Sequence, residues 1–395
     1  KRRCLTMLDP GLTYVTVMTP RGIGAIASCL VLGPAAFQAV NDCFSPRRKK
    51  PLTTTDQGRI LFGCWRGGEE LLVCVRDENS IEVHSHGGRV AVSGILKSLA
   101  DAGCQQCDDE QLLDFLVADP LVRLASRLLP TALTSRTAGL LLEQYRGGLS
   151  APLGRIVENL EAGELATARR ALEQLLRFAD LGRHLAKPWR VCLAGAANAG
   201  KSSLLNALLG YQRAIVHEQA GTTRDRLTAF TAVDGWPLEL VDTAGIRESN
   251  EPLEQAGIEL ARLSMESADI VVLVIDASQP AAGQSVLPGG IKDPLLVLNK
   301  WDLVDATAVV GSDLAEPPDP LPGRDGIRIS ATEKWGLQRL LDDLIRRLVI
   351  APDDPGQPVL CGDELIDAVS QAASAVDRGE VEDALRLLSS WYTRD

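Results

Sequence analysis

The sequence predicts a three-part fold: a small N-terminal α+β domain, then an α-helical domain into which a doubly wound α/β domain is inserted. Between about residues 188 and 350, apolar runs of strand length alternate with helix-length segments, which is typical of a mostly parallel sheet. Residues 108–187 and 351–395 carry leucines and alanines at three- and four-residue steps, which indicates helices. Residues 1–107 hold short β-rich runs broken by glycine and proline, with one helix-like segment.

The bulk composition is typical of a globular protein in a reducing compartment. The chain of 395 residues is 45% hydrophobic and 24% charged, and it contains no apolar run of the roughly 18 residues that span a bilayer. No leader-like segment opens it. The nine cysteines are scattered, which favours free thiols over a disulfide framework. We therefore expect a cytoplasmic protein that makes no membrane contact.

The net charge of −11 is unevenly distributed, with a basic N-terminal end and an acidic C-terminal end. The basic cluster "SPRRKK" at residues 45–50 could contact RNA phosphates. Such a short charge run in a loop is more often a solvated surface. The overall acidity argues against tight, non-specific binding of nucleic acid.

A phosphate-binding loop is predicted at "GAANAGKS", which matches G-x-x-x-x-G-K-[ST] and lies between a predicted strand and a predicted helix. Glycines allow the backbone N–H groups to approach phosphate oxygens, Lys201 reaches the β and γ phosphates, and Ser202 ligates Mg²⁺. The alternative is a chance glycine-rich turn, which the flanking strand and helix argue against. The predicted nucleotide-binding residues here are Gly195, Asn198, Ala199, Gly200, Lys201, Ser202 and Ser203.

The motif "NKWD" predicts that the base is guanine. It supplies Asn299, Lys300 and Asp302 at the end of a predicted strand, and ligands bind at that edge of a doubly wound sheet. The Asp302 carboxylate can accept two hydrogen bonds from guanine that adenine cannot donate, so ATP should bind far more weakly. "SAT" follows the next strand, where the backbone of Ser330 and Ala331 would approach guanine O6.

Two further segments predict a switch that senses the γ-phosphate. In "DTAG", Asp242 is expected to hold Mg²⁺ through water and the Gly245 N–H to meet the γ-phosphate. In "GTTRD", which begins at Gly221, the Mg²⁺ ligand is Thr223 or, as a weaker alternative, Thr222. Together the motifs make the inserted domain an α/β P-loop GTPase domain.

These segments resemble the TrmE/MnmE family of tRNA-modification GTPases. The resemblance is carried by "GAANAGKSSLLNALLG", "AIVHEQAGTTRD", "DTAGIRE" and "LEQAGIELAR", and more weakly by "TPRGIGAIASCLVLGP" and "IEVHSHGGRV". It implies the same three-part architecture, GTP/GDP as ligands, a homodimer, and tRNA and a flavoprotein as partners in wobble-uridine modification.

The resemblance also implies which groups carry out hydrolysis. Ile246 stands where Ras-like proteins keep a water-orienting glutamine, whereas the family uses a glutamate twelve positions after the aspartate of DTAG, here Glu254. The resemblance further implies that K⁺ takes the place of an arginine finger. In this chain Asn198 and the carbonyls of residues 217–221 would hold that ion, although His217 and Gln219 differ from the usual loop residues.

Three departures from the family pattern argue against one-carbon chemistry. The C-x-G-K motif is not found, and the last cysteine is Cys361. The arginine expected to contact a folate carboxylate is replaced by Leu30, and the F-x-x-R-A-F-x-N-G-K stretch is missing. Glu82 is the one residue that matches a folate-contacting position. We therefore expect little or no folate binding.

Two alternatives remain open at this stage. Cys104 and Cys107 with His84 and His86 form a set that could ligate zinc, although buried thiols beside a structural turn are the simpler interpretation. For function, the leading hypothesis is a Mg²⁺-dependent, K⁺-stimulated GTPase acting in tRNA modification. The second is a GTP-regulated binding switch in RNA or ribosome maturation that performs no modification chemistry.

Overall fold

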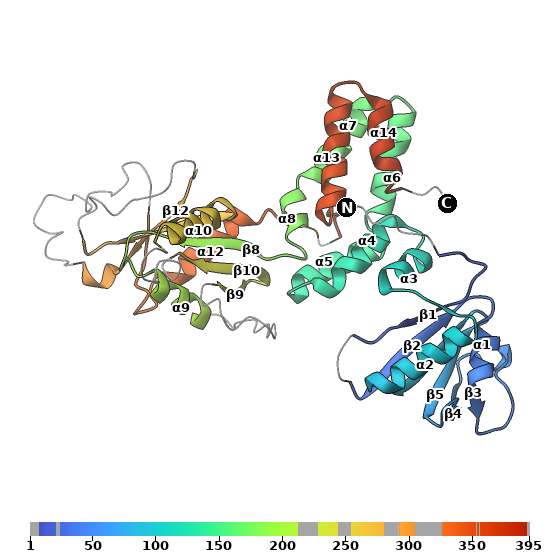
Figure 1. Ribbon diagram of the computed structural model, residues 1–395. Helices are drawn as coiled ribbons and strands as arrows, with labels where there is room; N and C mark the ends of the chain where they lie inside the picture. Colours follow the sequence, from blue (N-terminus) through green and yellow to red (C-terminus); the bar gives the residue numbers. More distant parts are fainter. Residues whose placement is uncertain are drawn as a thin grey trace, which may run out of the picture. The chain divides into compact units, whose positions relative to one another are not determined.

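The structure is a computed structural model that describes residues 8–20, 24–211, 228–243, 254–279, 291, 293–304, 326–352, 354 and 356–392. The chain divides into two compact units, Lys1–Ala118 and Asp119–Asp395 (Figure 1). The predicted border after residue 107 differs from the boundary between these units, which follows Ala118. The predicted borders after residues 187 and 350 lie within the second unit and stay predictions.

The first unit is built on a seven-stranded, mostly antiparallel sheet with the strand order β3-β4-β5-β6-β2-β1-β7. Its strands are β1 (Tyr14–Val17), β2 (Ile26–Leu32), β3 (Phe44–Pro46), β4 (Ile60–Trp65), β5 (Glu70–Asp77), β6 (Ser80–His86) and β7 (Gln105–Gln106). Its helices are α1 (Ala36–Cys43), the short 3-10 helix η1 (Thr54–Asp56), α2 (Arg89–Asp101) and α3 (Asp109–Leu116).

Alternation along the strands gives this sheet one apolar face and one mixed face. Val83 on β6 lies in the core with α1 and α2, while its neighbours Glu82 and His84 point to the opposite face. On that opposite face, Leu112 of α3 packs with Leu30 and Leu32 of β2. Helix α3 therefore belongs to the first unit.

The second unit contains a six-stranded sheet with the order β13-β12-β11-β8-β10-β9, in which only the β9–β10 pair is antiparallel. Its strands are β8 (Trp189–Ala194), β9 (Thr228–Val233), β10 (Trp236–Asp242), β11 (Ile270–Asp276), β12 (Leu295–Asn299) and β13 (Ile327–Arg328). Its helices are α9 (Lys201–Tyr211), α10 (Glu254–Glu266), the short η3 (Trp301–Leu303) and α12 (Leu337–Leu348).

Helices cover both faces of this sheet. Leucines of α9 and α12 pack in one cluster with Val272 of β11, whereas Met265 of α10 packs with Val271 on the other face. All seven residues of β11 are buried, as expected for a strand covered on both sides. The predicted doubly wound, mostly parallel sheet is confirmed.

The remaining helices of the second unit form a helical bundle, drawn from both sides of the α/β domain in sequence. They are α4 (Pro120–Leu128), η2 (Leu129–Thr131), α5 (Ser135–Tyr145), α6 (Ser150–Glu161), α7 (Leu165–Leu176), α8 (Ala179–Arg183), α13 (Asp363–Asp377) and α14 (Val381–Ser389). Helix α13 packs against α7 and α8, and α14 against α6 (Figure 1). Arg183 on α8 pairs with Asp363 at 3.0 Å and with Asp367 at 2.7 Å on α13.

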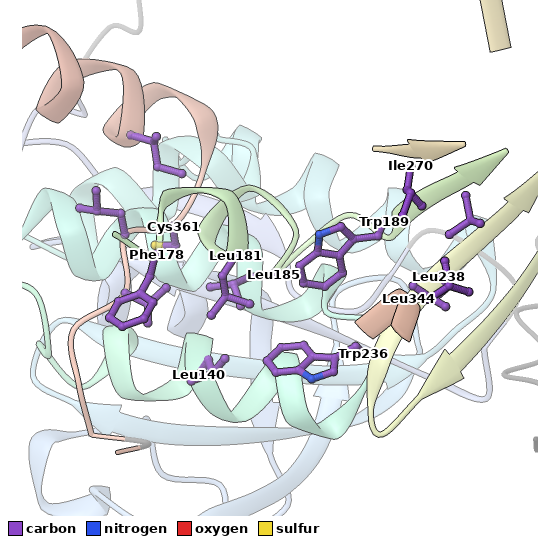
Figure 2. Packing of buried hydrophobic residues seen from close by; sticks show 14 of the residues in the cluster. Leu140, Phe178, Leu181, Leu185, Trp189, Trp236, Leu238, Ile270, Leu344 and Cys361 are labelled. Carbon is purple, nitrogen blue, oxygen red and sulfur yellow. The ribbon is translucent and has the colours of Figure 1, made fainter. Parts of the chain in front are cut away.

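The bundle contacts the α/β domain at the turn between β9 and β10. Thr134 Oγ1 donates to the Gly235 carbonyl at 2.6 Å, and Arg136 Nη1 donates to the Asp234 carbonyl at 2.7 Å. The Arg136 guanidinium also lies 4.5 Å from the ring centre of Trp236. Trp236 in turn meets Trp189 edge-on, and both lie in the apolar cluster drawn in Figure 2.

Each cysteine that the structure describes is a free thiol. No helix within the described part of the chain is both long and apolar enough to cross a membrane. In the basic cluster, Arg47 pairs with Glu70 at 2.8 Å and Arg48 with Asp56 at 2.5 Å, so two of its cations are occupied by carboxylates of the same unit.

Candidate functional site

The phosphate-binding loop follows β8 and is held close to two neighbouring strands. A Cβ added at Gly195 would lie 2.2 Å from the Val274 carbonyl oxygen, and one at Gly200 would lie 2.2 Å from Asn299 Nδ2. Both glycines have positive φ, at 139° and 91°. Only glycine fits such positions, so the sequence motif is explained by the packing of the loop.

Lys201 begins α9 and turns its side chain back into the loop. Its Nζ donates to the carbonyls of Gly195 at 3.0 Å and Ala196 at 2.8 Å, and the residue is only 5% exposed. A buried ammonium needs such partners. The charge therefore sits beside the N-terminus of α9, where backbone N–H groups and the helix dipole also favour an anion.

Two side-chain oxygens that could ligate a metal ion meet at the same edge of the sheet. Ser202 Oγ donates to Asp242 Oδ2 at 2.5 Å. The position of Asp242 is fixed because it ends β10 beside β8, and because Thr243 Oγ1 donates to the Leu193 carbonyl at 2.9 Å. A hydroxyl and a carboxylate are hard oxygen ligands of the kind Mg²⁺ prefers, so this donor set fits that ion.

Asn299 connects the three motifs of the nucleotide site. Its Nδ2 donates to the Ala199 carbonyl at 2.9 Å, and its Oδ1 accepts from the Ala331 N–H at 3.1 Å. The side chain is 2% exposed. It therefore ties the phosphate-binding loop to the "SAT" segment. The neighbouring Asp302 is exposed.

Sequence reasoning missed one member of this edge, Asp276. It ends β11 directly opposite Asn299 in the strand register, and its Oδ2 accepts from Lys300 Nζ at 2.7 Å. The sequence signal was a carboxylate that closes the apolar run "IVVLVID". Since carboxyl ends of parallel strands share one edge, that position marks a residue at the edge where ligands bind in sheets of this kind.

The predicted residues are only partly within the described structure. One edge of the sheet brings together Gly195, Ala199, Gly200, Lys201, Ser202, Asp242, Asn299, Lys300, Ser330 and Ala331. Beside them lie Asn198, in the loop, and Ser203, in α9. Gly221, Thr222, Thr223, Gly245 and Ile246 lie outside the described residues, as does the loop 217–221. Glu254 is the first residue of α10, but its side chain lies outside the described part as well.

A second polar group occupies the mixed face of the sheet in the first unit. Glu82 accepts from Arg76 Nη2 at 2.7 Å and lies 3.2 Å from His84 Nε2, while His84 Nδ1 is 2.8 Å from Ser28 Oγ. Leu30 is the direct cross-strand neighbour of Glu82. It is 8% exposed and packs against apolar side chains, so this position offers no cation to a folate carboxylate.

The zinc alternative does not agree with the structure. Cys104 lies in the core beneath α1 and α2, whereas Cys107 packs on the opposite face of the sheet. Burial raises the pKa of each thiol to about 11, which disfavours the thiolate that binds metal. Within the described residues, no three His, Cys, Asp or Glu side chains are grouped as a metal site.

Two comparisons with known proteins concern the α/β domain. A family model described as a 50S ribosome-binding GTPase matches residues 190–300. The FeoB G-domain from Methanococcus jannaschii aligns at 23% identity and a TM-score of 0.30, covering 41% of this chain and 98% of that one.

The similarity extends over nearly the whole chain for one group of proteins. The tRNA modification GTPase MnmE of Natranaerobius thermophilus is 30% identical over 428 residues, covering 94% of this chain and 88% of that protein. The MnmE of Heliobacterium modesticaldum is 31% identical, covering 88% and 83%. That of Bacillus subtilis is 31% identical, covering 74% and 73%. With relatives at least 30% identical over most of their length, and with the glycine-rich loop, Asn299 and the Ser202–Asp242 pair at one sheet edge, this chain belongs to the MnmE family of GTPases.

Proposed function

We propose that this GTPase couples GTP hydrolysis to the modification of tRNA at the wobble uridine, together with a flavoprotein partner. The observation that carries the proposal is the assembled nucleotide site, in which Asn299 joins the phosphate-binding loop to the guanine-binding segments. Relatives named as tRNA modification GTPases match the chain over both of its units. This agreement supports a role that uses the whole molecule and not the GTPase domain alone.

In this proposal the chain's own groups bind and neutralise the triphosphate. Lys201 exchanges its carbonyl partners for phosphate oxygens, and the N–H groups at the start of α9 add further donors. Ser202 and Asp242 would hold Mg²⁺, which spreads the charge that develops between the β and γ phosphates. Thr223, or Thr222, would complete the donor set.

Glu254 orients the attacking water in this scheme, and Asn198 contributes to a K⁺ site. Asn198 has a left-handed backbone with φ of 62° and an exposed side chain, so its amide is free to turn toward an ion beside the phosphates. A cation there would do what an arginine finger does elsewhere and accelerate hydrolysis by orders of magnitude.

The test of the hydrolytic scheme compares Glu254→Ala with Glu259→Ala. Both glutamates lie on α10, and Glu259 is exposed and paired with Arg262 at 2.6 Å. We expect Glu254→Ala to bind GTP normally but to turn it over at least tenfold more slowly, with Glu259→Ala unchanged. The parent protein should hydrolyse GTP faster in K⁺ buffer than in Na⁺ buffer. Equal rates for all three proteins would remove Glu254 from the scheme.

A second candidate function is a GTP-regulated binding switch that performs no modification. It is favoured by Leu30, because an apolar side chain at the cross-strand position beside Glu82 offers no cation to a folate carboxylate. Co-purification from native cells separates the two candidates. Recovery of tRNA with a flavoprotein supports modification, whereas recovery of ribosomal particles without a flavoprotein supports the switch.

A homodimer is part of both candidates, and the first unit offers a surface for it. The mixed face of its sheet exposes Ile26, Ile60, Phe62 and Leu72, which are 64%, 68%, 40% and 40% exposed. Phe62 and Leu72 are direct cross-strand neighbours, and exposed apolar side chains that lie together in this way typically mark an interface. Phe62→Glu should shift the protein to monomer in sedimentation experiments. A dimer that survives the change places the interface elsewhere.

A further inference from the structure

Lys300 of the guanine motif is fixed at both ends of its side chain. Its backbone has φ of 60° and ψ of 33°, an arrangement that few non-glycine residues adopt. Its Cε lies 4.0 Å from the point where a Cβ at Gly200 would stand, so the stem runs beside the phosphate-binding loop. Its Nζ donates to Asp276 Oδ2 at 2.7 Å. The long side chain therefore has a defined position before any nucleotide is considered.

Asp276 is itself held rigidly. It is 7% exposed, and its Oδ1 accepts from the Ser278 N–H at 3.0 Å and from Ser278 Oγ at 2.6 Å. Burial by itself would raise the pKa of Asp276, but the hydrogen bonds from Lys300 and Ser278 outweigh it and hold the pKa below its usual range. The carboxylate is thus charged at neutral pH, and its contact with Lys300 is a charge-assisted hydrogen bond.

We propose that Asp276 is a positioning residue for guanine nucleotides, acting through Lys300. A free lysine side chain samples many rotamers and loses that freedom when a ligand orders it. Because Asp276 orders Lys300 in advance, the stem and the ammonium are already placed beside the loop when the nucleotide arrives, which is preorganisation. The inference rests on the guanine nucleotide site described above and adds a residue to it.

The experiment is a double-mutant cycle on nucleotide affinity. The variants are Asp276→Ala, Asp276→Asn, Lys300→Met and the double variant Asp276→Ala with Lys300→Met. The control is Asp343→Asn on α12, which weakens ion pairs away from the nucleotide site, with Arg346 at 2.6 Å and with Arg347 at 3.4 Å. The readouts are the Kd values for fluorescent GDP and for a non-hydrolysable GTP analogue, and kcat at saturating GTP.

We expect Asp276→Ala to raise both Kd values about tenfold, as for the loss of one charge-assisted hydrogen bond. Asp276→Asn keeps an acceptor but loses the charge and should give a smaller increase. In the Lys300→Met background, Asp276→Ala should change Kd less than twofold, because the side chain it positions is gone. Asp276→Ala should raise Kd by a larger factor than it lowers kcat at saturating GTP, and Asp343→Asn should match the parent.

Two results would overturn the inference. One is an unchanged Kd in Asp276→Ala, and the other is an equal increase in the presence and absence of Lys300, which would indicate only support of the fold. If Asp276→Ala does not fold, the same cycle with Asp276→Asn decides the matter. Failure of the parent protein to bind either nucleotide would contradict the nucleotide site itself and is distinct from both results.

Discussion

The two sheets of this chain place their polar side chains differently. In the parallel sheet of the second unit, β11 is buried along its whole length, and the polar groups Asp242, Asp276 and Asn299 stand at strand ends. In the antiparallel sheet of the first unit, Glu82 and His84 lie in mid-strand, on one face. A strand that is covered on both sides can carry chemistry only where it ends, whereas a strand with one open face can carry it anywhere along that face.

The difference also determines what the polar groups contact. At the edge of the parallel sheet, Asn299 and Lys201 bond to backbone of the phosphate-binding loop, so they shape a site for a ligand. On the open face of the antiparallel sheet, Arg76, Glu82 and His84 pair with one another. One set bonds to the backbone of the phosphate-binding loop, and the other centres on Glu82, which pairs with both Arg76 and His84.

The largest effect on activity is expected from Lys201→Ala, which removes the Lys201 ammonium group from the edge of the parallel sheet where the nucleotide site lies. GTP hydrolysis should fall at least 100-fold, because phosphoryl transfer depends on fixed positive charge around the phosphates. The control is Lys187→Ala, which loses an exposed pair with Asp363 at 2.6 Å and should keep the parent rate. Phosphate release at saturating GTP measures both. If Lys201→Ala keeps more than a tenth of the parent rate, GTP hydrolysis does not depend on the charge of Lys201.

Asn299→Ala and Asn41→Ala compare the same device in the two units. Asn41 bonds to the N–H and carbonyl of Leu52 at 2.8 and 3.1 Å, in a partly buried place. Asn299→Ala leaves two buried backbone groups without their partner and should cost about 2–4 kcal/mol of unfolding free energy. Asn41→Ala should cost less and leave GTP affinity unchanged. Urea unfolding and nucleotide titration are the measurements, and equal losses of affinity would refute the distinction.

The ion pair of Arg48 with Asp56 makes the stability of the first unit depend on pH. The hydrogen bond from Arg48 holds the pKa of Asp56 well below its usual range. A lowered folded-state pKa stabilises the fold above the unfolded pKa of about 4, and that contribution is lost as pH falls below it. Arg48→Met should therefore reduce the drop in thermal midpoint between pH 6 and pH 3. Arg47→Met, whose pair with Glu70 is exposed, should leave the drop unchanged.

The smallest effect is expected at the contact between the bundle and the β9–β10 turn. Arg136→Ala loses a hydrogen bond to Asp234 and the contact with the Trp236 ring, which together should contribute about 1 kcal/mol at this exposed site. Arg177→Ala, which removes a similar contact with the Phe178 ring at 5.5 Å, is the matched control for an isolated cation–π pair. If Arg136→Ala lowers the unfolding free energy no more than Arg177→Ala does, Arg136 does not stabilise the turn.

The sequence predicted the mostly parallel sheet, and the described residues that it marked as a nucleotide site lie at one edge of that sheet, because both follow from local patterns. Apolar runs, glycine spacing and strand ends mark the loop at Gly195 and the motif at Asn299 without knowledge of the fold. The pair of Asp276 with Lys300 and the pair of Arg48 with Asp56 were not predicted. They depend on strand register and on loop packing, which no spacing along the chain encodes.

The placement of α3 shows the same limit. Its leucines continue a helical pattern that runs on into the next unit, so periodicity alone cannot assign it. The assignment comes from Leu112, which covers Leu30 and Leu32 on the mixed face of the first sheet. The zinc alternative did not hold for a related reason, since neighbouring cysteines in sequence lie on opposite faces of that sheet.

The insertion of the α/β domain determines the order in which the chain can assemble during synthesis. Arg183 and Asp363, which pair across α8 and α13, are 180 positions apart in the chain. Helices α6 and α7 leave the ribosome first, and the whole α/β domain follows before α13 and α14 exist to cover them. The apolar faces that α13 and α14 cover stay open throughout that interval, so the bundle closes only after the whole α/β domain has been synthesised.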